Sequence, residues 1–163
     1  MPSDRSAIDF ATWRAQFRSA LERGGNSAVP CDGCTACCRS HQFVHIDDDE
    51  TDTLAHIDPD LLVRTPGVDA HSWVMGYDTA GRCPQLTDTG CSIYEHRPRT
   101  CRTYDCRVFA AAGVRPDQPL VADRAATWVF TADDQVERCR DRAAQMTEPG
   151  RPPASVALAA VLG

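Results

Sequence analysis

The amino-acid sequence predicts an α+β fold: a small, mainly helical domain with a short antiparallel hairpin and loops that carry most of the cysteines. Apolar residues recur at spacings of three and four near both ends of the chain, which is typical of amphipathic helices. In the middle, short apolar and aromatic runs lie between turns that contain Gly and Asp, which indicates short strands. The length of 163 residues favours one domain that spans the whole chain, residues 1–163.

The first predicted element is a helix over residues 6–23. Ser6 with Asp9 resembles a capping box at its start, and Gly24 and Gly25 end it. The apolar residues on one face of this helix indicate a core surface rather than a cofactor site. They are Phe10, Trp13, Phe17 and Leu21.

The middle of the chain predicts short strands and one further helix. We expect strands over residues 43–46 and 73–77, and a short strand that enters Cys83. Residues 47–57 predict a helix whose acidic residues lie in its first turn, where the helix dipole favours them. The acidic run lacks the Gly and the spaced oxygen ligands of a calcium loop, so a capped helix start is favoured over a cation site. A turn at residues 87–90 then leads into the next cysteine segment.

The last third of the chain again favours helices. Residues 98–108 are expected to begin as a helical turn, because proline suits a first helical position. A strand is expected within residues 121–130, and residues 132–146 predict a helix. Residues 148–155 predict a linker, and residues 156–162 a short apolar tail. One face of the predicted helix carries Val136, Cys139 and Ala143.

Composition narrows the classes of function. A net charge of −6 and a sequence pI of about 5.2 argue against nucleic-acid binding through a broad basic surface. The first ten residues are polar and acidic, so we expect no signal peptide, and no run of apolar residues predicts a membrane span. We therefore expect a cytoplasmic protein. In that compartment a dense cysteine pattern indicates metal ligands or catalysis rather than disulfides.

Eight of the nine cysteines lie in two clusters. A C-x2-C pair lets both thiolates converge on one ion, and C-x2-C-x2-C matches the run that supplies most ligands of a ferredoxin-type 4Fe–4S cluster. The sequence therefore predicts a metal-stabilised core over about residues 31–106, followed by a C-terminal extension over residues 107–163. Cys139 stands alone on a helix face and is expected to be a core thiol. The predicted metal ligands are Cys31, Cys34, Cys37, Cys38, Cys83, Cys91, Cys101 and Cys106.

The ligand set leaves alternatives open. Adjacent side chains usually point apart, so Cys37 and Cys38 would serve different metals, or one of them would bridge two. Eight thiolates suit two four-coordinate centres, or one cluster with spare thiols. His41 or His96 could replace a cysteine, although a position at the surface or beside the ligands is favoured for each. Several arginines either stabilise a negatively charged centre or are ordinary surface residues: Arg39, Arg97, Arg99, Arg102 and Arg107.

One specific pattern extends through both cysteine clusters. It comprises Cys31-x2-Cys34-x2-Cys37-Cys38, Cys83-Pro-x-Leu86, Gly90-Cys91-x-Ile93-Tyr94, Arg97-Pro98, Cys101-Arg102-x-Tyr104 and Cys106. This pattern resembles the YkgJ-type CxxCxxCC cysteine-cluster family, which is described as zinc- or iron-chelating. The resemblance covers about residues 31–106, and it implies a bound metal without implying a reaction.

Three functions agree with these observations. The leading hypothesis is an iron–sulfur protein with a 4Fe–4S type centre, in electron transfer or as an accessory to a redox enzyme. The second is a zinc protein in which four-cysteine sites hold the fold together and present a surface to a protein partner. The third is a carrier that delivers iron or zinc. A thiol–disulfide enzyme is disfavoured because the C-x2-C pairs do not begin a helix after a βαβ pattern. No nucleophile–base pair stands out, so catalysis stays open.

Overall fold

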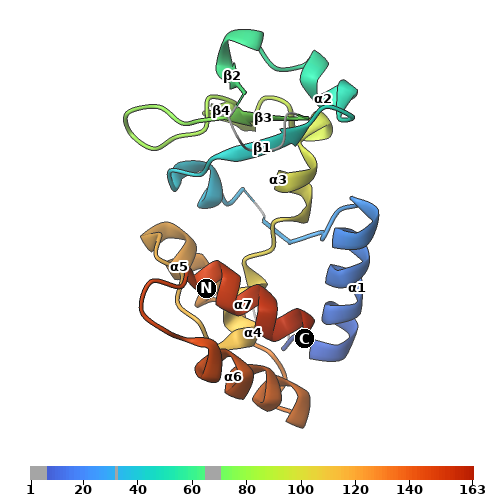
Figure 1. Cartoon of the computed structure of the whole chain (residues 1–163), viewed down its shortest axis with the longest axis vertical. Helices are drawn as coiled ribbons and strands as arrows, with labels where there is room; N and C mark the ends of the chain where they lie inside the picture. Colours follow the sequence, from blue (N-terminus) through green and yellow to red (C-terminus); the bar gives the residue numbers. More distant parts are fainter. Residues whose placement is uncertain (1–6, 32, 65–70) are drawn as a thin grey trace. The chain divides into compact units, whose positions relative to one another are not determined.

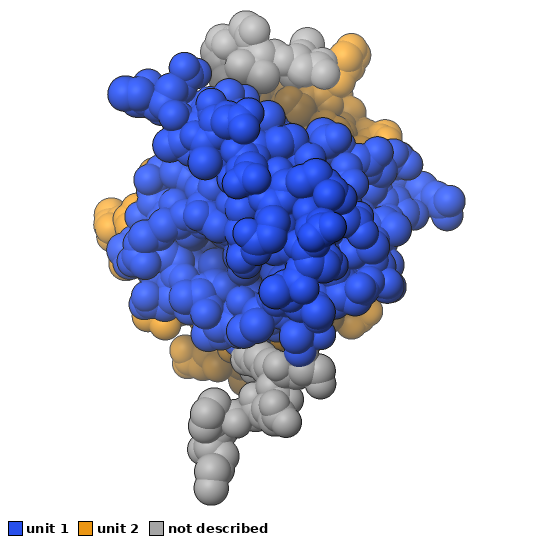
Figure 2. Space-filling view, turned by 90° about the horizontal axis from the view of Figure 1, so that it is seen from below, with its two compact units in different colours: residues 1–23, 105–163 blue, residues 24–104 orange. Residues whose placement is uncertain are grey.

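The computed structural model describes residues 7–31, 33–64 and 71–163, and the chain divides into two compact units. Unit 1 combines both ends of the chain, residues 1–23 with residues 105–163 (blue in Figure 2). Unit 2 comprises residues 24–104 (orange in Figure 2). Unit 1 is helical and unit 2 carries small antiparallel sheets, so the predicted α+β class is confirmed. The expectation of a single domain stays a prediction.

Unit 1 packs its helices around a core of aromatic and small side chains. Helix α7 contacts both α4 and α6, and its alanines Ala157 and Ala160 are fully buried, so these helices approach closely. Trp13 of α1 stacks on Phe17 with 5.5 Å between ring centroids. The helices of this unit (Figure 1) are α1 (Phe10–Arg23), α4 (Arg107–Ala112), α5 (Pro119–Ala125), α6 (Asp134–Met146) and α7 (Pro153–Leu162).

Helix α1 begins later than the sequence predicted. It starts at Phe10, and the Asp9 carboxylate accepts a hydrogen bond of 2.8 Å from the Thr12 backbone N–H, so Asp9 caps the first turn. The predicted partner Ser6 lies outside the described residues. Most of the predicted apolar face is buried, but Leu21 is partly exposed and Ala20 is buried in its place. The helix ends before Gly24, which adopts a left-handed conformation with φ +61°.

The strand expected within residues 121–130 is wrong. Residues Pro119–Ala125 form helix α5, because Pro119 occupies a first helical position and Val121, Ala122 and Ala125 then share one buried face. Only Phe130 at the far end of this segment makes a bridge, with Ile8. The apolar tail is likewise helical: α7 begins at Pro153, inside the segment that we expected to be a linker.

Unit 2 is organised around a three-stranded antiparallel sheet with the strand order β1-β3-β2. Its strands are β1 (Val44–Asp47), β2 (Leu62–Val63) and β3 (Ser72–Met75), and β1 aligns Ile46 with Trp73. Strand β1 alternates buried and exposed residues, as expected for a strand with one face on a core. That core is small and consists of Val44, Ile46, Ile57, Met75 and Ile93.

The remaining elements of unit 2 are short. They are the helices α2 (Thr51–Ala55) and α3 (Arg99–Thr103), the 3-10 turns η1 (Cys37–Arg39), η2 (Pro59–Leu61) and η3 (Tyr94–His96), and the strand pair β4 (Leu86–Thr87) and β5 (Gly90–Cys91). Strands β4 and β5 form the expected antiparallel hairpin. The strand that we expected to enter Cys83 is wrong, because β4 starts only after it, at Leu86.

The acidic run of unit 2 forms a turn rather than the start of a helix. Strand β1 continues to Asp47, and α2 begins only at Thr51. The Glu50 carboxylate accepts hydrogen bonds from the backbone N–H of Asp47 at 3.1 Å and of Arg99 at 2.6 Å. These hydrogen bonds close the turn. Most of the acidic residues therefore lie in this turn and not, as expected, in the first turn of a helix, where the helix dipole would stabilise them.

Candidate metal centre

Five cysteines of unit 2, here called the five-thiol cluster, lie together although they come from both sequence clusters. Cys83, Cys91 and Cys101 pack against the small apolar core of the unit. The Sγ atoms of Cys37 and Cys38 lie 4.0 Å apart. The backbone N–H of Cys83 donates a hydrogen bond of 2.8 Å to the carbonyl of Cys38, which joins the two cysteine segments directly.

The thiols of the cluster raise one another's pKa values. Burial, together with the charges of Cys37, Cys83 and Cys91, raises the pKa of Cys101 to about 12, and the Arg97 guanidinium opposes this rise. Burial also raises the pKa of Cys83, and the charges of Cys91 and Cys37 add to the effect. The hydrogen bond with Cys38, followed by burial, raises the pKa of Cys37. Four sulfurs from distant segments therefore influence one another electrostatically.

A backbone N–H also points at the cluster. The amide of Gln85 hydrogen-bonds Cys83 and lowers its pKa, partly offsetting the effect of burial. This amide follows Cys83 in the turn that precedes β4, where the carbonyl of Cys83 also accepts a hydrogen bond of 3.0 Å from the Leu86 N–H. Such amides stabilise thiolate charge and tune a bound metal.

The expectation that Cys37 and Cys38 point apart is wrong. Both begin the 3-10 turn η1, where successive side chains are about 120° apart because there are three residues per turn. A strand would point them to opposite faces, but this turn leaves their sulfur atoms on the same side, 4.0 Å apart. Both thiols can therefore approach a single centre, and two metals are not needed to explain the pair.

The other predicted ligands are Cys31, Cys34 and Cys106. Cys31 is exposed and Cys34 half-buried, in a loop closed by a 2.7 Å hydrogen bond from the Cys34 N–H to the Cys31 carbonyl. Cys106 belongs to unit 1, where it is buried and its sulfur accepts a 3.2 Å hydrogen bond from Nε1 of Trp128. Ligation by these three cysteines stays a prediction. Cys139 is fully buried in α6, as expected for a core thiol, and all nine cysteines are free of disulfides.

The arginines near the cysteines have divided roles. Arg97 lies over the ring of Tyr94, with its guanidinium carbon 3.7 Å from the ring centroid, and acts on Cys101 electrostatically. Arg99 instead pairs with Asp47 at 2.8 Å and Asp49 at 3.0 Å, and so neutralises the acidic turn. Arg97 is therefore a flanking arginine whose charge acts on a thiol of the cluster.

His41 does not reach the thiols as a ligand would. It adopts φ +53°, its backbone N–H donates a 3.0 Å hydrogen bond to the Gly81 carbonyl, and its ring makes a T-shaped contact with Tyr77. A Cβ at position 81 would lie 2.2 Å from the His41 ring, and Gly81 itself has φ +77°. Glycine is therefore required where the two segments that carry the clusters cross.

A second group of metal-ligand side chains was missed by the sequence analysis. Asp52, His56 and His96 each offer an oxygen or nitrogen atom, and these atoms lie within 4.8 Å of one another. The Asp52 carboxylate lies 2.8 Å from Nδ1 of His96, and this hydrogen bond is the largest cause of the lowered pKa of Asp52. The signal available in the sequence was the spacing of Asp52 and His56, which places both on one side of a helix.

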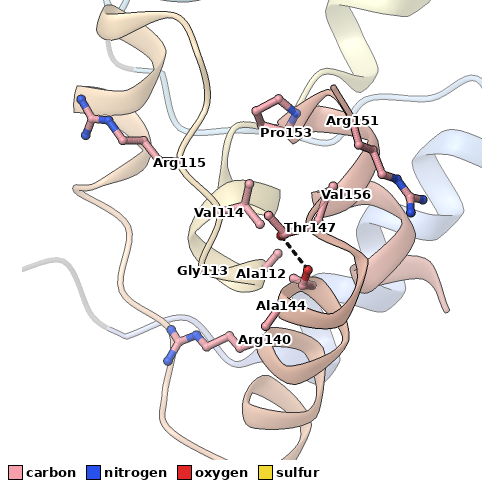
Figure 3. A pocket seen from close by; sticks show the side chains of 11 residues that line it. Ala112, Gly113, Val114, Arg115, Arg140, Ala144, Thr147, Arg151, Pro153 and Val156 are labelled. Carbon is pink, nitrogen blue, oxygen red and sulfur yellow. Dashed lines mark hydrogen bonds between the residues drawn. The ribbon is translucent and has the colours of Figure 1, made fainter. Parts of the chain in front are cut away.

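Unit 1 contains a groove of about 410 Å³ between α4, α6 and α7 that does not form an anion site. Three arginines border it, but Figure 3 shows that the side chains of Arg115, Arg140 and Arg151 point away from one another. Arg140 also approaches Glu137, at 3.6 Å. Because the guanidinium groups do not converge, these arginines do not bind an anion together in this groove.

The site defines the chain as a cysteine-rich metal-chelating domain, and comparison with known families agrees. The chain belongs to the CxxCxxCC family, whose description is "Putative zinc- or iron-chelating domain" and whose model matches residues 30–127, more than half of the chain. A search of curated proteins and a search of solved structures each return no match. Within the described ranges, none of the helices has both the length and the apolar composition to cross a bilayer.

Proposed function

We propose that this chain is a metal-binding protein whose five-thiol cluster holds a 4Fe–4S type centre in a redox or accessory role. The observation that carries the proposal is the meeting of Cys37 or Cys38 with Cys83, Cys91 and Cys101 beside one core. An all-thiolate donor set suits soft metals, iron–sulfur clusters and zinc alike. Four of the five sulfurs would serve as ligands, with the adjacent pair offering one ligand and one spare thiol.

The spacing of the sulfurs supports a cluster over a single ion. A tetrahedral zinc bound at about 2.3 Å brings its sulfur ligands to about 3.8 Å from one another. Among the described residues, which include every cysteine, no three sulfur atoms lie within 4.8 Å of one another. A four-iron cubane holds its cysteine ligands at its outer corners and therefore needs the wider arrangement.

Residues around the thiols would stabilise the negative charge of the thiolates that bind a metal. When bound, the centre would supply one-electron redox chemistry. The thiols with raised pKa values stay neutral at pH 7 without a metal, so they release protons when they become ligands. The guanidinium of Arg97 and the amide of Gln85 then stabilise the thiolates. A reducing compartment such as the cytoplasm would keep these cysteines available.

Zinc is the second candidate, and one observation favours it. The 4.0 Å between the sulfurs of Cys37 and Cys38 is close to the separation of two thiolates on one zinc ion. In that case the centre would stabilise unit 2 and present its surface to a protein partner. Such a partner stays a prediction.

The deciding experiment is purification of the full chain without oxygen, followed by absorption spectroscopy and analysis for iron, acid-labile sulfide and zinc. A 4Fe–4S centre gives a brown protein with about four irons and four sulfides per chain. A colourless protein with about one zinc per chain supports the second candidate instead. Freshly prepared protein without iron and without sulfide would refute the iron–sulfur proposal.

A further inference from the structure

A cluster of side chains at the surface of unit 2 has ligand chemistry different from that of the thiols. Asp52 and His56 lie one helical turn apart, in α2 and at its C-terminal end, and His96 ends the 3-10 turn η3. The imidazole rings of His56 and His96 stack with 3.5 Å between centroids and 7° between planes. The stack holds the two imidazole rings side by side, and imidazole nitrogen is a common metal ligand.

Oxygen and nitrogen atoms converge on one side of this stack. Nδ1 of His96 lies 2.8 Å from Oδ2 of Asp52, and Nδ1 of His56 lies 3.9 Å from Oδ1 of the same carboxylate. The backbone carbonyl of Asp52 lies 2.8 Å from Nδ1 of His56. Ligand atoms bound at about 2.0–2.2 Å to a tetrahedral ion are about 3.4 Å apart. The observed separations lie on both sides of that value, so the side chains must move to bring all three groups to it.

We propose that Asp52, His56 and His96 form a second metal site that binds a borderline divalent transition-metal ion such as Zn²⁺. Two imidazoles and one carboxylate make a donor set that suits such ions, and it differs from the all-thiolate set of the five-thiol cluster. The ion takes the place of the proton between His96 and Asp52. The inference does not depend on which metal the thiols hold.

The exposure of the three side chains makes the site exchangeable. The side chains are 72% exposed for Asp52, 41% for His56 and 38% for His96, so solvent reaches a bound ion. The two parallel rings must tilt for their lone pairs to meet at one ion, and at the surface they have room to do so. Both histidines adjoin segments of the small core of unit 2, since His56 precedes Ile57 and His96 follows Ile93 by three residues. That core positions them.

The test uses the full chain as purified, with its own centre in place, and Zn²⁺ as the probe. Imidazole signals are followed by ¹H–¹³C NMR during addition of one equivalent of Zn²⁺. The signals of His56 and His96 should shift together, and that of His45, an exposed residue of β1, should stay in place. Replacing Zn²⁺ with Co²⁺ should give ligand-field bands without a sulfur-to-cobalt charge-transfer band, which separates this site from the thiols.

Calorimetric titration of matched variants gives the second readout. His96→Gln and Asp52→Asn should each weaken Zn²⁺ binding at least about tenfold, because even residues that merely support a ligand are worth about 10–100-fold. His45→Gln should leave the affinity unchanged. If the two histidine signals do not move, or if all three variants bind Zn²⁺ equally well, the group is only an ion pair between α2 and η3 and the proposal is wrong. If the purified protein lacks a cysteine-bound centre but the signals of His56 and His96 still shift on addition of Zn²⁺, only the proposed function is refuted and the second site stands.

Discussion

Replacement of Cys101 with serine is the most direct perturbation of the five-thiol cluster. Cys101 lies in α3, packs on the core of unit 2 and is electrostatically coupled to three other thiols. Serine keeps the size of the side chain but removes the soft ligand. Because loss of a supporting residue already costs about 10–100-fold in metal affinity, loss of a direct ligand should cost more than about 100-fold. We expect purified Cys101→Ser protein to lack the metal of the five-thiol cluster.

Loss of the centre should also unfold unit 2. In small peptides a structural zinc contributes about 10–16 kcal/mol of apparent binding free energy, whereas the stability of a whole domain is about 5–15 kcal/mol. Among the described residues, the apolar core cluster of unit 2 has five buried side chains, and three of the thiols pack against it. Helix α3 is joined to β1 by a 2.7 Å hydrogen bond from the Thr100 hydroxyl to the His45 carbonyl. If α3, which carries Cys101, unfolds, strand β1 and the sheet that contains it should therefore lose structure too.

Hydrogen exchange measured by mass spectrometry is the appropriate assay. Amides of β1 and β3 should lose protection in the Cys101→Ser protein, while those of α6 in unit 1 serve as an internal reference. Circular dichroism is less sensitive, because α2 and α3 have five residues each and α1 alone has 14. Melting of unit 2 thus removes little of the helical signal.

The matched control is Cys34→Ser, which changes a cysteine outside the five-thiol cluster. If the five-thiol cluster alone supplies the ligands, this variant retains the metal and the protection of the sheet. Two results would refute the reasoning. If β1 and β3 remain protected in metal-free Cys101→Ser protein, the metal is not needed for folding. If Cys34→Ser loses the metal as completely as Cys101→Ser, the five-thiol cluster is not the ligand set.

Three further predictions follow from the same contacts. Metal affinity should rise by at least about 10²-fold per pH unit between pH 6 and 8, because at least two of the three thiols with raised pKa values become ligands and each releases a proton. Competition titrations that show release of fewer than two protons would contradict this. Asp105→Ala should destabilise unit 1 by about 3–5 kcal/mol, measured by urea unfolding. The substitution leaves the nearly buried Arg107 without the carboxylate that now lies 2.7 Å from its guanidinium. A loss of less than about 1 kcal/mol would show that the ion pair is dispensable. Cys139→Ala should cost about 1 kcal/mol, the loss of a small buried group, and leave the metal content unchanged, as elemental analysis can check.

Errors in predicting the elements have identifiable physical causes. The segment that follows Pro119 contains apolar residues that suit either a strand or a buried helix, and the packing of α5 selects the helix. The acidic turn before α2 was mistaken for a helix start because the sequence does not reveal that Glu50 bonds to Arg99, 49 residues away. Helix α6 was predicted nearly in full, since its cap at Asp133 and its buried face are both local features.

The sequence by itself determined the chemistry of the site. Cysteine identity, the C-x2-C-x2-C spacing and the composition are local properties, and they indicate a chelating domain without any knowledge of the chain path. Only the tertiary structure decided which groups meet: it brings Cys83, Cys91 and Cys101 to the first cluster, and it places His96 beside Asp52 across 44 residues of sequence. Contacts of this kind depend on how turns and a small core fold distant segments together, and residue spacing carries no record of that path.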